Sequence, residues 1–508
     1  MEELKPIRSA LISVYHKDRV DEIARRLFEL GITLYSTGGT YDFIAALGIP
    51  VQTVESLTSY PSILGGRVKT LHPKVFGGIL YRRDNPEDRN QLEQYDIPGI
   101  DLVIVDLYPF EATVSSGASR DDIIEKIDIG GISLIRAAAK NFEDVVIVPS
   151  SDQYDRIINL LEDKKGFTTL EDRLYFAAQA FNVSSHYDTA IFNYFNRDTG
   201  IKAFKKSILN SEEMRYGENP HQQAVYFGDA SESFEQLNGK AISYNNLVDL
   251  DSAISLIGEF EEPAFVIIKH TNACGVAVRP KLIHAWQDAL AGDPLSAYGG
   301  VLATNRPIDP ETAEEINKLF FEILLAPAFE KNALEILKSK KNRIILQHKP
   351  TDFQAKQFKS ILNGVLEQGR DTQTESPADL HVVTKTSPDN QQVKDLIFAN
   401  IIVKHLKSNA IVLAKNGQLL GAGCGMTSRV DALKHAIAKS QEFGFSLEGA
   451  VMASDAFFPF ADSVEIASKA GIKAVIQPGG SVRDDDSIRY CNEHGVSMTI
   501  TGTRHFRH

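Results

Sequence analysis

The sequence predicts an α/β protein of more than one domain, and three observations lead to this prediction. The chain has 508 residues, whereas a typical domain has ~100–200. Hydrophobic residues make up 43% and charged residues 24%, a balance typical of globular proteins with full cores. Between residues 8 and 148, short β-rich runs alternate with helical patterns, which indicates a parallel sheet with helices on both faces.

The composition excludes some classes of function. Lys and Arg together number 54 and Asp and Glu 67, which gives a net charge of −13. An acidic surface is unsuited to binding along nucleic-acid phosphates or anionic lipid, so we expect neither nucleic acid nor a membrane as partner. Small anionic substrates remain compatible with this charge, because a local cationic pocket can lie on an acidic protein.

The cysteines and the N-terminus indicate the compartment. The cysteines are odd in number, far apart and never in a C-x-x-C pair, which argues against a disulfide framework and a thiolate zinc site (Cys274, Cys424 and Cys491). Charged residues precede the first apolar run, so we expect no ordinary signal peptide. No apolar stretch reaches the ~20 residues that span a bilayer. We therefore expect a cytoplasmic protein.

The first domain is predicted to comprise residues 1–197. Buried strands are expected at residues 10–14, 32–35, 102–105 and 145–148. Apolar residues recur at helical spacing over residues 20–28, and Gly31 ends that helix. A long amphipathic helix over residues 170–195 closes the domain, and the polar stretch 196–200 marks the boundary.

The second domain, residues 198–508, contains a weak internal duplication. Residues 265–278 form two apolar runs with a polar interruption, followed by a helix and the sequence GGVLATN at 299–305. Residues 410–423 repeat this order, followed by a helix and GAVMASD at 449–455. We expect two similar α/β lobes, approximately 198–390 and 391–508. Residues 338–341 and 371–376 are polar and predicted to be solvated loops.

Two glycine-containing segments of the first domain are candidates for anion binding. STGGT at 36–40 follows a strand and opens a helix, where free amides favour phosphate, although an ordinary strand-to-helix turn has the same pattern. GGRVKTLHP at 65–73 combines two glycines, two cations, a hydroxyl and a histidine. Neither a core element nor a solvated loop needs that combination, so a site for a phosphorylated or oxyanionic ligand is favoured.

Three further segments could supply proton transfer. DLYPF at 106–110 ends a buried strand, where doubly wound sheets place functional loops. Alternatively, its aromatic residues simply pack under the next helix. Asp128 precedes a Gly-Gly helix start and could be only an N-cap. Lys140 ends a helix, where its role could be no more than to complement the helix dipole. Together, two lysines, a tyrosine and an aspartate at neighbouring element ends are a plausible proton-transfer group.

The second domain has its own candidates. A buried strand terminates in Lys269 and His270, which could act as electrostatic stabiliser and general base. RYGENPHQ at 215–222 suits phosphate and heterocycle binding, though an ordered linker would look similar. DAFFPFAD at 455–462 is either a core plug or a platform for a flat ring. The basic terminal segment 503–508 is either a frayed tail or a clamp for an acidic aromatic ligand.

Taken together, these motifs resemble one family. GGRVKTLHP, DLYPF, DIGG, RAAAKN, RYGENPHQ, IIKHTNACG, KSNA, SDAFFPF and RHFRH occur in the order found in the bifunctional purine biosynthesis family, and the likeness covers residues 13–508. This family joins phosphoribosylaminoimidazolecarboxamide (AICAR) formyltransferase to inosine monophosphate (IMP) cyclohydrolase. The resemblance implies a methylglyoxal-synthase-like first domain and a transformylase domain of two cytidine-deaminase-like lobes without zinc.

For the cyclohydrolase half, the resemblance implies two groups of residues. Catalysis is assigned to Lys69, Tyr108, Asp128 and Lys140, with both lysines stabilising the developing oxyanion and Tyr108 and Asp128 relaying protons. Substrate binding is assigned to Ser13, Thr37, Gly38, Gly39, Thr40, Arg67, Thr70, Asp106 and Ile129.

For the transformylase half, the resemblance assigns catalysis to His270 as base and Lys269 as stabiliser of the tetrahedral intermediate. AICAR binding is implied for Arg215, Tyr216, Gly299, Glu322, Asn409 and Arg429. The folate end is implied to be Val430, Phe457, Asp462, Ser481, Arg504 and Phe506. The cosubstrate implied is 10-formyltetrahydrofolate, without a catalytic metal, and the family is homodimeric with shared transformylase sites.

Four positions depart from the family pattern. Tyr15 and His16 stand where Ser and Asp are common, and Asp106 replaces a usual Asn. An acid beside a phosphorylated ligand is unfavourable unless it faces ribose hydroxyls. Ala273 replaces a usual Pro after Asn272, which loosens that turn without removing a catalytic side chain.

Two other functions are compatible with part of the sequence. A zinc deaminase would share the lobe architecture, but the sequence lacks H-x-E followed by P-C-x-x-C. A nucleotide-sensing scaffold that lost catalysis would bind AICAR without turnover, but the retained Lys69, Lys140, Lys269 and His270 argue against it. The sequence therefore predicts the bifunctional enzyme.

Overall fold

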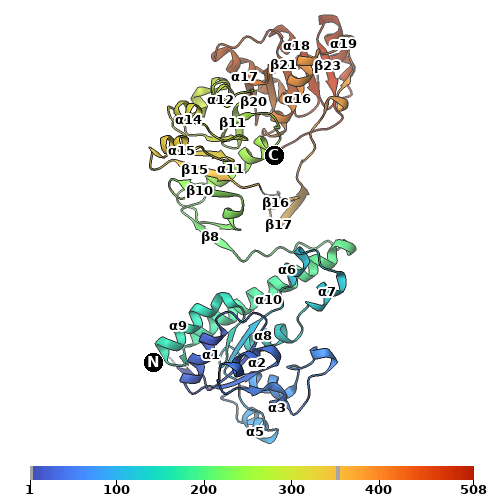
Figure 1. Cartoon of the computed structure of the whole chain (residues 1–508). Coiled ribbons are helices and arrows are strands. Elements are labelled where there is room, and N and C mark those ends of the chain that lie inside the picture. The colour runs from blue at the N-terminus through green and yellow to red at the C-terminus, as the bar shows by residue number, and fades with distance from the viewer. Residues whose placement is uncertain (1–3, 351–354) are drawn as a thin grey trace. The chain divides into compact units, whose positions relative to one another are not determined.

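The computed structural model describes residues 4–350 and 355–508, which fall into two compact units. Unit 1 is Met1–Leu209 and unit 2 is Asn210–His508 (Figure 1). Within the described ranges, no helix combines the length and apolar character of a membrane span.

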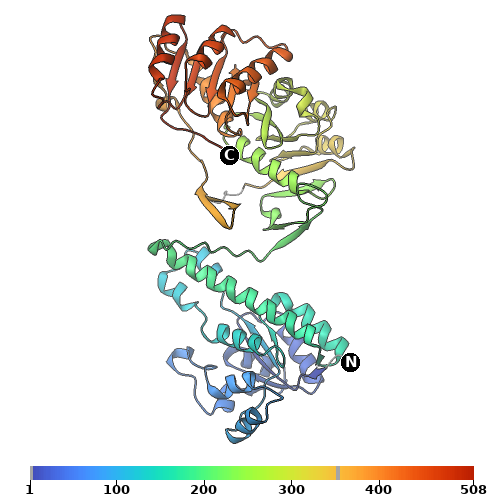
Figure 2. The ribbon, with the colours of Figure 1, turned by 180° about the vertical axis from the view of Figure 1, so that it is seen from behind.

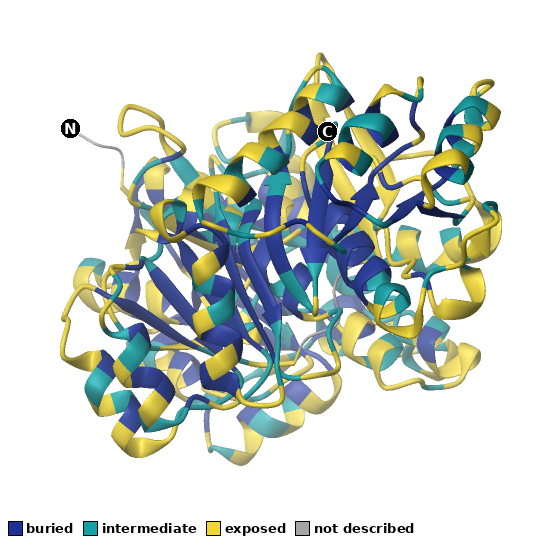
Figure 3. Cartoon of the chain, turned by 90° about the horizontal axis from the view of Figure 1, so that it is seen from above, coloured by how far each residue is buried: buried dark blue, intermediate teal, exposed yellow. Residues whose placement is uncertain are grey.

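Unit 1 is built on a parallel sheet with strand order β4-β3-β2-β5-β6. Its strands are β2 (Ser9–Val14), β3 (Thr33–Ser36), β4 (Gln52–Thr53), β5 (Leu102–Asp106) and β6 (Val146–Val148). Most strand residues of this sheet are buried, because helices cover it. Figure 3 marks the buried residues of the chain in dark blue. The strand order reverses beside β2, whose neighbours are β3 and β5. The carboxyl ends of β2 and β5 therefore form the switch point where such sheets place ligands.

Helices surround this sheet, and α10 runs along one side of the unit (Figure 2). Packing contacts join α8 to β5, β6 and α10, and α1 to β3 and α9. The short strand β1 (Lys5–Pro6) pairs with β7 (Phe167–Thr168). The helices are α1 (Val20–Glu29), α2 (Gly38–Ala46), α3 (Val54–Thr58), α4 (Pro73–Leu80), α5 (Pro86–Gln94), α6 (Phe110–Ser115), α7 (Arg120–Glu125), α8 (Gly130–Lys140), α9 (Tyr154–Lys164) and α10 (Leu170–Thr199).

The two units divide after Leu209, twelve residues beyond the predicted boundary at 197. Helix α10 begins with a capping box at Thr169 and continues to Thr199. The chain then returns along α10: the His186 ring lies 3.0 Å from the Ser207 hydroxyl, and Asn193 donates to the Lys205 carbonyl. These contacts hold the segment after the helix in unit 1.

Unit 2 contains a long mixed sheet with strand order β10-β15-β14-β13-β11-β12-β20-β19-β21-β22-β23-β18. The strands are β10 (Phe234–Asn238), β11 (Ala264–Lys269), β12 (Asn272–Val278), β13 (Val301–Thr304), β14 (Ile323–Ala326), β15 (Ile344–His348), β18 (His381–Val382), β19 (Ile411–Lys415), β20 (Gln418–Gly423), β21 (Val451–Ser454), β22 (Ala474–Gln477) and β23 (Ser497–Ile500). Separate hairpins pair β8 (Ser211–Met214) with β9 (Ala224–Phe227) and β16 (Lys356–Ile361) with β17 (Gly364–Gly369).

The helices of unit 2 alternate with these strands. They are α11 (Tyr244–Ile257), α12 (Leu282–Gly292), α13 (Pro294–Ala297), α14 (Pro310–Ile316), α15 (Lys331–Lys338), α16 (Asn390–Lys404), α17 (Arg429–Glu442), α18 (Asp462–Lys469) and α19 (Asp484–His494). Short 3-10 turns occur in both units at η1 (Leu64–Gly66), η2 (Ser151–Gln153), η3 (Ala230–Glu232) and η4 (Pro377–Asp379).

The strand order confirms the predicted duplication. From β12 to one side and from β20 to the other, equivalent strands follow in the same sequence. The hairpin β11–β12 corresponds to β19–β20, and the parallel strands β13-β14-β15 correspond to β21-β22-β23. Close helix packing also recurs. A β-carbon on Gly275 would lie 2.1 Å from the Ala289 carbonyl oxygen of α12, and one on Gly423 1.9 Å from the Ala432 carbonyl oxygen of α17.

Candidate functional site

The segments of unit 1 that are predicted to bind an anion meet at the start of α2. The Thr37 hydroxyl is buried and has no hydrogen-bond partner in the described part of the chain. Gly38 has a φ of 52°, in the left-handed region that glycine adopts readily. The Lys69 Nζ lies 3.3 Å from the position that a β-carbon on Gly38 would occupy. An ammonium group therefore lies against the open helix N-terminus, an arrangement that attracts an anion.

Several predicted contacts of this site are already used within the chain. Thr40 exchanges hydrogen bonds with the Val14 backbone, at 3.2 and 2.9 Å, so its hydroxyl ties α2 to β2 rather than standing free for phosphate. The exposed Arg67 pairs with Glu125. Thr70 is buried, with its hydroxyl 3.0 Å from the β-carbon position of Gly130. The other predicted contacts lie on the same elements: Ser13 on β2, Gly39 in α2, and the exposed Ile129 at the start of α8.

Asp128 and Tyr108 are the residues of this arrangement that are predicted to transfer protons. The Asp128 carboxylate accepts the Gly131 N–H at 2.6 Å and also the backbone N–H of Tyr108. It thereby joins the loop after β5 to the N-terminus of α8. The Tyr187 hydroxyl accepts the Asp128 N–H at 2.9 Å and donates to the Lys126 carbonyl.

The electrostatic surroundings shift both groups. Burial raises the pKa of Asp128 above its usual value, although N–H groups from Gly131 and Tyr108 act in the opposite direction. Burial also raises the pKa of Tyr108, and the Asp128 charge adds to this. A carboxyl group that holds its proton more readily beside a neutral phenol suits the exchange of protons.

Lys140 lies at the opposite end of α8 from the contact between Gly130 and Thr70. Gly130 and Lys140 are the two ends of the eleven-residue helix α8, so they lie about 15 Å apart. Gly130 contacts Thr70, whereas Lys140 lines a separate cavity of about 410 Å³ with Arg136 and the rings of Phe76 and Phe181. The assignment of Lys69 and Lys140 to the same oxyanion stays a prediction.

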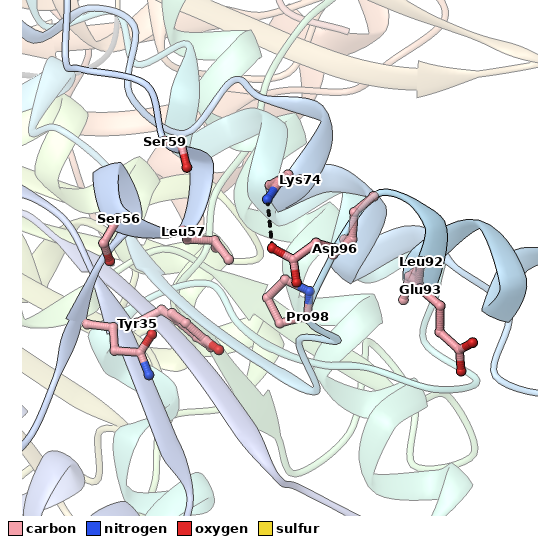
Figure 4. Close-up of a pocket in the computed structure, with 11 residues that line it drawn as sticks. Tyr35, Ser56, Leu57, Ser59, Lys74, Leu92, Glu93, Asp96 and Pro98 are labelled. Carbon is pink, nitrogen blue, oxygen red and sulfur yellow. Dashed lines mark hydrogen bonds and ion pairs between the residues drawn. The ribbon is translucent and has the colours of Figure 1, made fainter.

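A larger cavity of about 450 Å³ lies beside α3, α4 and α5 (Figure 4). Its lining includes Tyr35, Ser56 and the ion pair between Lys74 and Asp96, whose atoms are 3.2 Å apart. None of the predicted site residues lines it.

In unit 2, Lys269 and His270 lie where β11 turns into β12. Lys269 donates to the Tyr298 carbonyl at 2.5 Å, and its Nζ lies 3.3 Å from the β-carbon position of Gly299. Gly299 has a φ of 71°. A side chain at Gly299 would therefore crowd the ammonium group and strain the backbone. The structure brings the predicted residues Lys269 and Gly299 into contact, with His270 next to Lys269 in the chain.

The turn that presents His270 is strained. His270 and Thr271 have φ values of 50° and 64°, a conformation that costs a non-glycine residue roughly 1–2 kcal/mol. Asp249 on α11 compensates for this, because its carboxylate accepts the Thr271 N–H at 2.7 Å and also the His270 N–H. Burial raises the pKa of Asp249. Asn272 extends the contact, since its side-chain oxygen accepts the Lys407 N–H at 3.0 Å.

The second lobe contributes a buried ion pair beside this turn. Arg429 donates to Asp455 at 2.8 Å, to the Asn409 side-chain oxygen at 3.0 Å and to the Phe457 carbonyl at 3.2 Å. One Asp455 carboxylate oxygen is buried without a hydrogen-bond partner among the described residues. The arginine thus fixes the predicted nucleotide residue Asn409 and the predicted folate residue Phe457 in one cluster.

The predicted folate-end residues lie after parallel strands and at the starts of α17 and α18. Phe457 and Asp462 follow β21, Ser481 follows β22 and the terminal segment follows β23, while Val430 lies in the first turn of α17. Of the aromatic residues in the loop after β21, Phe458 is fully buried, whereas Phe457 and Phe460 are 38% and 51% exposed. The core-plug interpretation is therefore confirmed for Phe458, while the ring-platform interpretation stays a prediction for Phe457 and Phe460.

The terminal segment is anchored rather than frayed. His505 is 2% exposed, and its ring contacts Asp371 at 2.6 Å and Glu375 at 3.0 Å. Arg507 exchanges backbone and hydroxyl hydrogen bonds with Ser408. These contacts correct the expectation that 371–376 is only a solvated loop. They leave Arg504 stacked on the half-exposed Phe506, 4.4 Å from its centroid.

Three predicted contacts are not tied to the cluster around Lys269. Arg215 lies over the Tyr216 ring, 5.1 Å from its centroid, next to the β8–β9 hairpin. Glu322 pairs with Lys240 at 2.7 Å, while its backbone N–H donates to the Gly300 carbonyl.

The sequence analysis did not identify three residues that contact the predicted sites: Asp249, Tyr187 and Lys126. Each lies in or beside a helix and belongs to no motif.

Clusters of three or more His, Cys, Asp or Glu side chains that could hold a metal ion are absent from the described residues. The cysteines Cys274, Cys424 and Cys491 are free. Burial raises the pKa of the Cys274 and Cys491 thiols to about 12. These thiols are therefore poor nucleophiles and poor metal ligands at neutral pH.

Two family models match the chain. The model of the AICARFT/IMPCHase bienzyme matches residues 138–439, and that of the MGS-like domain matches residues 19–133. These ranges contain all of the predicted catalytic residues, whereas Ser13 and most of the predicted folate end lie outside them (Phe457, Asp462, Ser481, Arg504 and Phe506).

Full-length relatives are also similar to this chain. The bifunctional purine biosynthesis protein PurH of Bacteroides thetaiotaomicron is 61% identical over 508 residues, covering all of both chains. The PurH proteins of Persephonella marina and Aquifex aeolicus are 46% and 47% identical. The alignments cover 99% and 98% of this chain and all of each relative.

Proposed function

This chain belongs to the AICARFT/IMPCHase bienzyme family, and we propose that each of its two compact units holds one of the two reactions. The chain is a bifunctional purine biosynthesis enzyme that catalyses the last two steps of IMP formation. A formyl-folate first formylates the 5-amino group of AICAR to give FAICAR. FAICAR then closes to IMP with loss of water. We assign formyl transfer to unit 2 and ring closure to unit 1.

Ring closure requires mainly positioning and charge stabilisation. The carboxamide nitrogen and the formyl carbon belong to one molecule, so their effective concentration is already high. Attack forms the N–C bond and converts the formyl oxygen to an oxyanion, which the Lys69 ammonium stabilises beside the α2 N-terminus. Asp128 and Tyr108 then exchange the protons by which nitrogen is neutralised and the oxygen departs as water.

Formyl transfer requires a base, because the 5-amino group of AICAR is conjugated with its ring and is a poor nucleophile. Histidine is the side chain whose charge changes nearest neutral pH, so His270 is suited to accept the amine proton. Lys269, held by the Tyr298 carbonyl at 2.5 Å, stabilises the tetrahedral oxyanion. The observation that supports this most strongly is the strained turn that presents His270 between Lys269 and the Asn272–Lys407 contact.

The remaining assignments follow the family resemblance. We propose 10-formyltetrahydrofolate as donor, bound near Val430, Phe457 and the Arg504–Phe506 pair, and AICAR bound near Gly299, Asn409 and Arg429. We further propose a cytoplasmic homodimer with shared transformylase sites. Purified protein supplied with AICAR and the formyl-folate tests the function, with tetrahydrofolate and IMP followed separately. Binding of AICAR without formation of either product would favour the scaffold alternative.

Asp249 is expected to be needed for formyl transfer although it need not touch substrate. Replacing Asp249 by alanine removes the acceptor for two N–H groups of a strained turn. We expect formyl transfer to fall roughly ten- to hundredfold, mainly in kcat, because His270 loses its orientation.

Asp249→Asn retains one acceptor oxygen and is expected to recover part of the loss. Ring closure of supplied FAICAR, measured on the same preparations, should be unchanged. A rise in the KM for AICAR at constant kcat would contradict this positioning role.

The anchor of the terminal segment predicts a pH dependence of stability. Burial alone would lower the pKa of His505, but hydrogen bonds and charge from Glu375 and Asp371 outweigh it, so the pKa is raised. The ion pair therefore stabilises the fold fully below the ordinary histidine pKa of about 6.5, and this stabilisation is lost as pH rises through the raised value. Glu375→Gln should lower the unfolding midpoint by several degrees at pH 6 and by progressively less at alkaline pH.

Thermal unfolding across this pH range checks the prediction. The half-exposed Glu465, paired with Lys469, provides the control: Glu465→Gln is expected to change the midpoint little at any of these pH values. An effect of Glu375→Gln that is constant with pH would show that the imidazole charge is not involved.

A further inference from the structure

The unusual residues of unit 1 contact one another. Tyr15 and His16 follow β2, Asp106 ends β5, and Val14 lies opposite Asp106 in the parallel register. The His16 backbone N–H donates to an Asp106 carboxylate oxygen at 2.9 Å, and the His16 Nδ1 lies 2.6 Å from the same oxygen. The Asp106 carboxylate, predicted from the resemblance to contact substrate, is thus paired within the chain at the switch point of the sheet.

The charge of Asp106 extends to the proposed ring-closing group. It acts with burial to raise the pKa of Asp128, and it partly offsets the burial that lowers the pKa of Lys17. Tyr154, buried nearby, has its pKa raised by burial and by Asp106 and Asp18. An uncompensated carboxylate at this point would oppose both ionisation of Asp128 and approach of a phosphorylated substrate.

Tyr15 connects this pair to the proposed catalytic tyrosine. Its ring meets the Tyr108 ring edge to face, with centroids 5.5 Å apart. The Lys126 Nζ lies 5.1 Å from the Tyr15 centroid and 5.7 Å from that of Tyr108. Because Tyr15 is adjacent to His16, the hydrogen bonds of His16 also fix the backbone that carries this ring.

We propose that His16 and Asp106 act as one positioning unit for ring closure. The two contacts of His16 hold the Asp106 carboxylate at the switch point, and they hold Tyr15 against Tyr108. This proposal rests on the proposed roles of Tyr108 and Asp128. It also explains three departures from the family pattern together, since a carboxylate at position 106 is matched by an imidazole at position 16.

A double-mutant cycle tests the coupling. His16→Asp places a second carboxylate beside Asp106 and is expected to lower kcat/KM for ring closure of FAICAR at least about tenfold, with partial recovery in high salt. Asp106→Asn alone is expected to cause a loss of roughly threefold. The double variant, in which the new carboxylate faces a neutral amide, should return to within about threefold of the parent enzyme. Losses that simply multiply in the double variant would overturn the proposal.

Two controls separate the possible failures. Formyl transfer and thermal unfolding of the same preparations report on folding, and a second cycle with His16→Gln repeats the test with a milder change. Absence of coupling in both cycles overturns the proposed positioning role of His16 and Asp106. Lys69→Met, assayed in parallel, tests the proposed function itself. Ring closure at the full rate in that variant would contradict the proposed catalytic roles of Lys69, Asp128 and Tyr108. Loss of activity in Lys69→Met with an additive cycle would discard only the role of His16 and Asp106.

Discussion

Replacing His270 by alanine is expected to abolish formyl transfer and to leave ring closure intact. Loss of a general base typically costs a factor of about 10²–10⁴, and the AICAR amine is a weak nucleophile that needs one. Lys269 would retain its contact with the Tyr298 carbonyl, so the rest of the site should persist. Tetrahydrofolate release from the formyl-folate and IMP formation from supplied FAICAR, measured separately, check the result.

A surface histidine of the same unit provides the matched control. His284 lies on the exposed side of α12, and His284→Ala is expected to leave both activities near the parent values. Simultaneous loss of both activities in His270→Ala would argue against two separate sites. Retention of formyl transfer would remove His270 from the mechanism.

Replacing Lys69 by methionine should have the reciprocal effect. Removal of one oxyanion-stabilising group costs about 10²–10³ in kcat, and methionine preserves the length of the side chain without its charge. We expect ring closure of FAICAR to fall by that factor while AICAR formylation proceeds normally, so that FAICAR accumulates. Product analysis during turnover of AICAR would detect this accumulation.

Lys74, five residues further on and paired with Asp96 beside the larger cavity (Figure 4), is the matched control. Lys74→Met removes a charge from the same segment without approaching Gly38, so ring closure should change little. Equal losses in Lys69→Met and Lys74→Met would indicate a general effect of charge on the loop. That result would contradict a specific role for the Lys69 ammonium.

Local patterns were sufficient for the elements and for the duplication of unit 2. Buried strands read as continuous apolar runs, and the helix starting at Leu170 carries a Thr169–Asp172 capping box within a few neighbouring residues. The candidate segments also lay at strand ends, as parallel sheets require. Periodicity and capping depend on neighbours in sequence, so they can be recognised without the fold.

Distances across the fold could not be predicted in this way. Lys140 shares a family motif, yet the length of α8 separates it from Gly130 and from Thr70. Asp249 carries no motif, but α11 brings its carboxylate to the strained turn at His270. The apparently solvated segment 371–376 supplies two acids to the buried His505.

The amino-acid sequence by itself determined that this is an α/β chain with the motifs of both purine-synthesis reactions, because these features are written in short stretches of neighbouring residues. Only the tertiary structure decided which charged groups meet. His16 and Asp106 are separated by ninety positions and become partners because parallel pairing of β2 and β5 brings their carboxyl ends together. Electrostatic interaction depends on distance in space, and that distance exists only once the sheet has formed.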